Sequence, residues 1–236
     1  MFYIDWTYII LVMPAVIFAS WASMRVNTTF EKYSRQLSAR RMTGAEAARR
    51  VLSANGIYDV QIQKIKGNLT DHYDPKANVI RLSEAVHDGI STAAIGVAAH
   101  EAGHAVQHAQ NYAPVKIRTA IVPITNIGSK LSIPLILIGI LLSYLGAIFS
   151  YIAYAGVAAF GLCVVFQLVT LPTEFNASSR ALVAIEQCGI LSTEEIKGSR
   201  KVLSAAALTY VAALAVTLMQ FLRLFLIVAG SNNRRR

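Results

Sequence analysis

Three long stretches of the chain contain no charged side chain, and they constrain its fold more than any other feature. They cover residues 6–24, 131–173 and 202–222. Because a helix rises 1.5 Å per residue, the middle stretch is about 64 Å long, enough for two crossings of a hydrocarbon core roughly 30 Å thick. Each of the other two is long enough for about one crossing. The sequence therefore predicts an integral membrane protein with about four transmembrane helices.

The basic residues indicate which side of the membrane the polar part occupies. The net charge is +9, and seven basic residues follow the first apolar stretch. Beside a membrane segment such a cluster marks the cytoplasmic side and anionic lipid. A nucleic-acid partner is not expected, since the chain lacks a basic stripe with stacking aromatics. The cluster consists of Arg25, Lys32, Arg35, Arg40, Arg41, Arg49 and Arg50.

The two ends of the chain complete this topology. Asp5 precedes the first apolar run and the positive charge follows it, so residues 1–24 are expected to form an uncleaved anchor with an external N-terminus. The terminal run 234–236 is Arg-Arg-Arg, and four crossings would place it outside, against the positive-inside rule. Cys163 and Cys188 show no pairing pattern that would imply a disulfide framework.

The polar stretch after the anchor predicts a small α+β domain. Thr43 and Glu46 form a capping box that opens a helix over 43–54. Alternating and extended segments then predict a short antiparallel sheet, and Ser91 opens a helix to about 110 that is apolar on nearly every face and that Pro114 ends. The expected strands are 59–65, 69–73 and 79–82.

The second half of the chain predicts membrane helices around one polar segment. Residues 131–171 are expected to form a helical hairpin that turns within 143–151. Pro172 is expected to begin a polar loop, and Ser192 with Glu195 forms a second capping box before the last span.

The buried helix carries His100-Glu101-Ala102-Gly103-His104, an HExxH motif. Histidines four residues apart project from one helical face, which suits two imidazole ligands of a tetrahedral zinc ion. The glutamate between them is placed to act on a metal-bound water. The alternative, a pair of core histidines, would bury two imidazoles and a carboxylate without partners, at a high cost.

Catalytic zinc requires a third protein ligand, and the chain offers two candidates. His108 lies one turn further along the helix, but ligands at i, i+4 and i+8 span about 12 Å of axis, which zinc bonds near 2 Å do not bridge easily. His108 is therefore expected to assist the ligands or pack the helix. Glu174 is favoured, because two crossings return the chain to the side of His104; a solvated loop carboxylate is its alternative role.

Four segments of the sequence resemble the bacterial membrane-bound neutral zinc metallopeptidases of the YugP type, and more distantly the HtpX-like gluzincins. The resemblance implies that His100, His104 and Glu174 bind one zinc ion and that Glu101 is the general base. Ser178 stands where the wider pattern has aspartate, so Asn176 or Ser178 is expected to orient a ligand histidine. The segments are LTDHYDP, VIRLSEAV, HEAGHAVQHAQ and LPTEFNASSRAL.

These observations predict a membrane-embedded zinc metalloendopeptidase that hydrolyses membrane or membrane-proximal proteins with a zinc-activated water. His72, Tyr73 and Arg180 are candidate transition-state donors, and segment 69–73 or 79–82 could receive the substrate as an added strand. The alternatives are a non-proteolytic membrane scaffold or chaperone with a structural zinc, and a transporter, although no ionisable residue lies inside the hairpin. A second membrane protein or a second copy of the chain stays open as a partner.

The expected organisation is an α+β membrane protein of five parts, with the catalytic domain on the cytoplasmic side. The parts are an anchor over 1–24, a zincin-like catalytic domain over 25–118, a transmembrane hairpin over 119–171, a loop and helix with the third ligand over 172–204, and a last transmembrane helix with a basic tail over 205–236.

Overall fold

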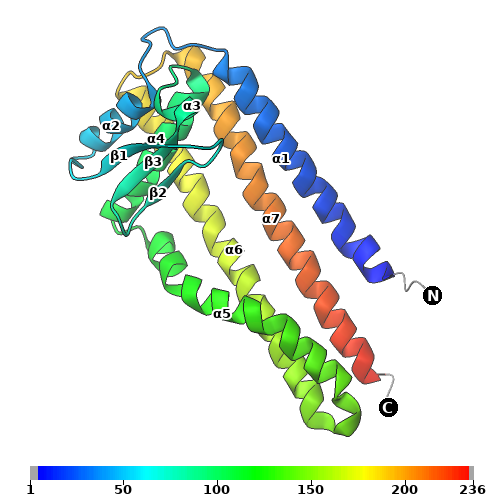
Figure 1. Ribbon diagram of the computed structural model, residues 1–236. Helices are drawn as coiled ribbons and strands as arrows, with labels where there is room; N and C mark the ends of the chain where they lie inside the picture. Colours follow the sequence, from blue (N-terminus) through cyan, green and yellow to red (C-terminus); the bar gives the residue numbers. More distant parts are fainter. Residues whose placement is uncertain (1–4, 234–236) are drawn as a thin grey trace. The chain divides into compact units, whose positions relative to one another are not determined.

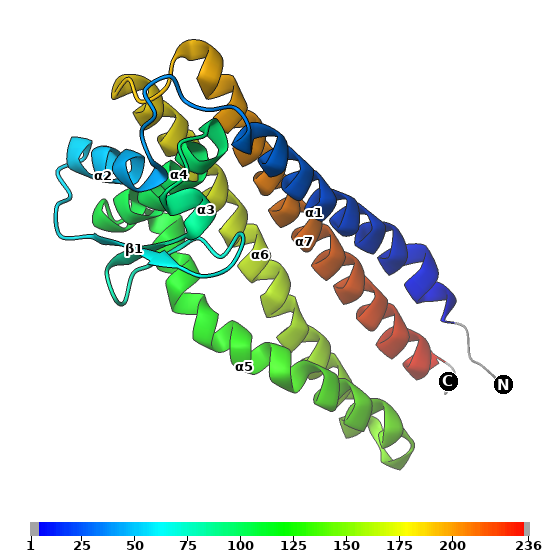
Figure 2. The same ribbon diagram turned by 45° about the horizontal axis from the view of Figure 1, so that its top comes forward.

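The structure is a computed structural model that describes residues 5–233, so the predicted basic tail at 234–236 lies outside the described residues. It confirms a mostly helical α+β membrane protein with a small sheet (Figures 1 and 2). Four helices are long and apolar enough to cross a membrane, as predicted: Tyr8–Ser34, Ala113–Leu141, Ala147–Gln187 and Thr193–Ser231.

The chain forms two compact units, each built from separate parts of the sequence. The soluble unit comprises residues 22–116 and 172–209, and the membrane unit comprises residues up to 21, 117–171 and those from 210. Helices α1, α5, α6 and α7 therefore contribute residues to both units.

The membrane unit is a set of long helices. A π-helical turn η1 (Tyr8–Val12) leads into α1 (Met13–Ser34), and α5 (Ala113–Leu141) is joined to α6 (Ala147–Gln187) by the short 3-10 helix η2 (Ser143–Leu145). The hairpin thus turns where the sequence predicted. The last helix, α7 (Thr193–Asn233), lies beside α1 (Figure 1).

Small residues bring the two hairpin helices into contact. A Cβ atom on Gly139 would lie only 2.4 Å from the backbone nitrogen of Ala153, and one on Gly156 would lie 2.7 Å from the carbonyl oxygen of Ser132. Helices in lipid associate through such close packing, since apolar burial between helices gains little there. The absence of side chains at these glycines therefore sets the distance between α5 and α6.

An ion pair joins the first and the last segment of the membrane unit. The Arg223 guanidinium on α7 donates to Asp5 from Nε at 3.1 Å and also from Nη2, and it lies over the ring of Tyr8. Hydrogen bonds from Thr7 and Arg223 lower the pKa of Asp5 to about 2. The acidic residue before the first span thus neutralises the arginine at the end of the last one.

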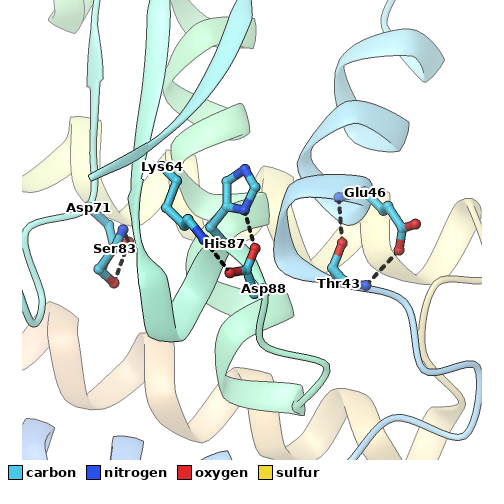
Figure 3. Close-up of polar contacts among 7 residues, drawn as sticks. All are labelled: Thr43, Glu46, Lys64, Asp71, Ser83, His87 and Asp88. Atoms are coloured by element: carbon cyan, nitrogen blue, oxygen red, sulfur yellow. Dashed lines mark hydrogen bonds and ion pairs between the residues drawn. The ribbon is translucent and has the colours of Figure 1, made fainter. Parts of the chain in front are cut away.

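The soluble unit begins with the predicted capped helix, α2 (Gly44–Ala54). Thr43 accepts from the Glu46 backbone N–H, and the Glu46 carboxylate accepts from the Thr43 backbone N–H, which confirms the capping box (Figure 3). Two side-chain contacts connect segments that follow this helix. Ser83 donates to Asp71, and Lys64 forms an ion pair with Asp88 (Figure 3).

The sheet is mixed, which corrects the antiparallel arrangement expected from the sequence. Its strands are β1 (Gln61–Ile65), β2 (His72–Asp74) and β3 (Val79–Ser83), in the order β1-β3-β2. The hairpin pairs β2 with β3 antiparallel, while β1 pairs with β3 parallel. The last strand takes the centre because both of its faces are buried, whereas β1 is largely exposed.

The HExxH helix forms as predicted, but Pro114 begins the next helix and does not end this one. Helix α4 (Thr92–Ala109) follows the short α3 (Glu84–His87) and is capped by Ser91, which accepts from the Ala94 backbone N–H. Pro114 lies in the first turn of α5, where its missing N–H would have no helical partner anyway.

The predicted loop after Pro172 is wrong, because α6 continues through this proline to Gln187. A proline inside a helix costs about 3 kcal/mol. Burial after the proline offsets this cost, since small and apolar side chains at helical spacing pack into the core of the soluble unit. These are Ala177, Ala181, Ala184 and Ile185. The capping box at Ser192 and Glu195 is confirmed at the start of α7.

Replacement of Gly139 by alanine should destabilise the hairpin, although alanine normally favours a helix by up to ~1 kcal/mol. The added methyl meets the Ala153 backbone at 2.4 Å, and such overpacking costs ~1–3 kcal/mol. We expect the unfolding temperature in detergent to fall by several degrees, on a scale of ~2–4 °C per kcal/mol.

The matched control is Gly230→Ala on α7, where no atom lies within 4 Å of the added methyl. It should leave the unfolding temperature unchanged or slightly raised. Equal effects of the two substitutions would contradict the packing described for α5 and α6.

Candidate metal centre

Two helices of the soluble unit supply the residues of the centre. His100 and His104 project from one face of α4, with their rings edge to face at 4.7 Å between centroids. Glu174 comes from the part of α6 that belongs to this unit. Its Oε2 lies 3.4 Å from the Nε2 of each histidine. Residues 70 positions apart in the sequence thus converge on one point.

The geometry of the three donor atoms fits a zinc ion. All three lie within 4.8 Å of one another. Ligand atoms about 2.0–2.1 Å from a tetrahedral zinc are about 3.4 Å apart, which matches the distance from the carboxylate to each imidazole. A direct hydrogen bond would be shorter, at about 2.7–3.2 Å. Two imidazoles and one carboxylate also form a donor set known from catalytic zinc sites.

The centre is sheltered from solvent, and its charges influence one another. Glu174 is 3% exposed and Glu101 is 7% exposed. Burial by itself would lower the pKa of His104, but the neighbouring Glu174 and Glu101 carboxylates together raise this pKa above its ordinary value. The two carboxylates therefore create a local negative field that favours a bound cation.

Each histidine is held on its other ring nitrogen by a neutral side chain. Ser178 Oγ lies 3.0 Å from His100 Nδ1, and Gln107 Oε1 lies 3.0 Å from His104 Nδ1. Ser178 was one of the two residues expected to orient a histidine. The sequence reasoning missed Gln107, although a polar residue three positions after His104 on an apolar helix was a usable signal.

The other predicted residue, Asn176, acts one step further away. Its Oδ1 accepts from Gln107 Nε2 at 2.9 Å and from Arg180 Nε at 2.7 Å. Arg180 also donates to Gln110 at 2.6 Å and lies over the ring of Tyr112. Arg180 thus braces the hydrogen-bond chain behind His104, and a role as transition-state donor stays a prediction.

The remaining candidates lie around β2 and the end of α4. His72 is exposed, and its Nδ1 lies 2.8 Å from the Thr70 carbonyl oxygen. The Tyr73 hydroxyl donates to Asn78 at 3.0 Å, and burial, with smaller contributions from Asp59 and Asp74, raises the pKa of Tyr73. The Tyr73 ring meets His108 edge to face at 5.9 Å. His108 therefore packs against β2, and the catalytic roles of His72 and Tyr73 stay predictions.

A mostly helical α+β membrane fold in which two histidines of an HExxH helix meet a glutamate from a second helix is typical of zinc metallopeptidases. The chain belongs to the family described as "Putative neutral zinc metallopeptidase", which matches residues 8–229. It is similar to the "Putative membrane protease YugP" of Bacillus subtilis (strain 168), with 47% identity over 220 residues that cover 93% of this chain and 96% of that protein. No solved structure matches the chain significantly.

Gly103, inside the HExxH motif, sets the distance between the two helices of the centre. A Cβ atom there would lie 2.7 Å from the Ala177 carbonyl oxygen on α6. We expect Gly103→Ala to separate α4 from α6 by a few tenths of an ångström, more than the ~0.2 Å that metal bond lengths tolerate. Zinc affinity, measured by competition with a chromophoric chelator, should fall by ~10-fold or more.

Gly96→Ala is the matched control on the same helix. Its added methyl would meet the Ser199 side chain on α7 at 3.0 Å and has no neighbouring atom on α6 among its nearest contacts. It should lower stability without changing zinc affinity. If Gly103→Ala binds zinc as tightly as the parent protein, the helix spacing does not control the site.

Proposed function

We propose that the protein is a membrane-embedded zinc metalloendopeptidase that cleaves membrane or membrane-proximal proteins. The observation that carries this proposal is the 3.4 Å spacing of Glu174 Oε2 from both His100 Nε2 and His104 Nε2, with Glu101 on the same helix. His100, His104 and Glu174 are the proposed ligands of one zinc ion. A non-proteolytic scaffold or chaperone with a structural zinc is the second candidate, because a three-ligand site would also suit it.

Different residues of the chain have different roles in the proposed reaction. A bound zinc ion lowers the pKa of water toward 7 and polarises a peptide carbonyl. Glu101, buried and one position after the first ligand, accepts the proton of the attacking water and returns it to the leaving amine. Tyr73, whose phenol is protonated at neutral pH, is a proposed donor to the carbonyl oxygen in place of its present acceptor Asn78.

The sheet suggests how a peptide substrate would bind. Strand β3 is flanked on both sides, so segment 79–82 cannot accept another strand. Strand β2 is an edge strand, and it packs on α4, which carries Glu101. We therefore propose that an extended substrate pairs with β2, where backbone hydrogen bonds would bind it largely independently of sequence.

The Glu101→Gln substitution tests the catalytic mechanism. It removes the base and no ligand, so the purified protein should retain about one zinc ion and lose cleavage of an unstructured protein by ~100-fold or more. Glu186→Gln, an exposed carboxylate on α6, is the control and should cleave normally. Undiminished cleavage by Glu101→Gln would support the scaffold with a structural zinc.

Metal analysis of two further variants tests the ligand set. Glu174→Ala should lose most of the bound zinc, because two histidines alone make an incomplete site. His108→Ala should keep near-normal zinc with a modest loss of stability, since His108 packs on Tyr73. The opposite outcome, an empty site in His108→Ala and a filled one in Glu174→Ala, would reject the proposed ligands.

We also propose that the soluble unit lies on the cytoplasmic side, on the strength of the basic cluster that follows the first apolar stretch. Helix α5 then crosses the membrane once, and the turn between α5 and α6 lies outside. In a protein with Cys163 and Cys188 replaced by alanine, a cysteine at the exposed Tyr144 should react with an impermeant maleimide on whole cells. A cysteine at the exposed Arg40 should react only after permeabilisation, and labelling of that position on intact cells would reverse the topology.

A further inference from the structure

The Gln107 side chain occupies an unusual position for a glutamine. It is 0% exposed, although it lies on a helix whose other buried residues are mostly alanine and glycine. A buried primary amide without partners would cost several kcal/mol. All of its hydrogen-bonding groups are engaged, as the contacts of its oxygen and nitrogen show.

The nitrogen of this amide fixes the direction of the oxygen. Nε2 donates to the Thr173 carbonyl oxygen at 2.8 Å and to Asn176 Oδ1 at 2.9 Å. Both of these atoms are acceptors, so an inverted amide would place oxygen against oxygen twice. Asn176 is held in turn, because its Oδ1 also accepts from Arg180 Nε. The amide orientation is therefore determined by α6 and not by His104.

The fixed oxygen in turn selects the tautomer of His104. Gln107 Oε1 can only accept, so His104 Nδ1, 3.0 Å away, must carry the proton. The proton-free lone pair then lies on Nε2, the atom that faces Glu174 at 3.4 Å. A neutral imidazole binds a metal through its unprotonated nitrogen, and the partner of the other nitrogen decides which one that is.

The same amide joins the two helices of the centre. Thr173, whose carbonyl accepts from Gln107, immediately precedes Glu174 on α6. The Gln107 side chain thus fixes both the orientation of the His104 ring and the position of the backbone next to Glu174. Ser178 also reaches from α6 to His100, but it does not select the tautomer of that histidine, since a hydroxyl can act as donor or acceptor.

We propose that Gln107 is a positioning residue that holds His104 in the tautomer with the proton on Nδ1 and aligns Glu174 with it before metal binds. This inference deepens the proposed function, on whose ligand set it rests. The glutamine occupies the role that a carboxylate beside a ligand histidine often has. Because an amide has no net charge, the centre gains this orientation without a third buried carboxylate.

The test uses full-length protein in detergent, labelled with ¹⁵N-histidine and free of metal. The His104 signals, assigned by their loss in His104→Gln, should show a protonated Nδ1 in the parent protein. Gln107→Met, similar in length but unable to hydrogen bond, should lose this preference and bind zinc ~10–100-fold more weakly. Gln187→Met, an exposed glutamine at the end of α6, is the matched control and should resemble the parent in both measurements.

A second variant separates positioning from folding. Gln107→Glu keeps an acceptor beside His104, so it should preserve the Nδ1-protonated form even if stability falls. Loss of that form in Gln107→Glu, or its retention in Gln107→Met with parental zinc affinity, would overturn the proposal. The tautomer is read without metal or cleavage, so a failure of the peptidase mechanism at Glu101 would be recognised separately.

Discussion

The close approach of α4 to α6 at Gly103 controls the position of every proposed ligand. His100 and His104 lie on one helix and Glu174 on the other, so the distance between these helices determines whether three donor atoms can meet. The contact of Gly103 with the Ala177 backbone leaves no space for a methyl group. A glycine inside the motif therefore has a geometric role beside the chemical roles of its neighbours, and the alanine-rich core around it serves the same close packing.

The placement of Glu174 on a continuous helix also makes the geometry of the centre more rigid. Ligands on helices hold their geometry better than ligands on loops. Within the soluble unit, the Gln107 amide and the Ser178 hydroxyl add contacts between α4 and α6. The arrangement is thus preorganised, and the entropy of ordering the third ligand is lost during folding and not during metal binding.

Local features were predictable from the sequence, whereas features that depend on distant contacts were not. The capping residues Thr43 and Ser192 and the metal motif follow from patterns within a few residues. The central position of β3 depends on tertiary burial, which strand-length patterns do not report. Pro172 predicts the start of a loop because a proline disfavours helix, but the core packing of Ala181 and Ile185 outweighs that preference. The role of Gln107 was missed because the two acceptors that fix its amide lie 66 and 69 residues away.

The soluble unit is assembled from two parts of the chain that the hairpin separates, and this has a consequence for biosynthesis. Glu174 follows His104 by 70 residues. At ~5–20 residues per second, the ribosome adds those residues in roughly 4–14 s. During that interval the nascent chain carries two of the proposed ligands and the proposed base but not the third proposed ligand. A proposed metal centre assembled in this order cannot be complete until both hairpin helices have been made.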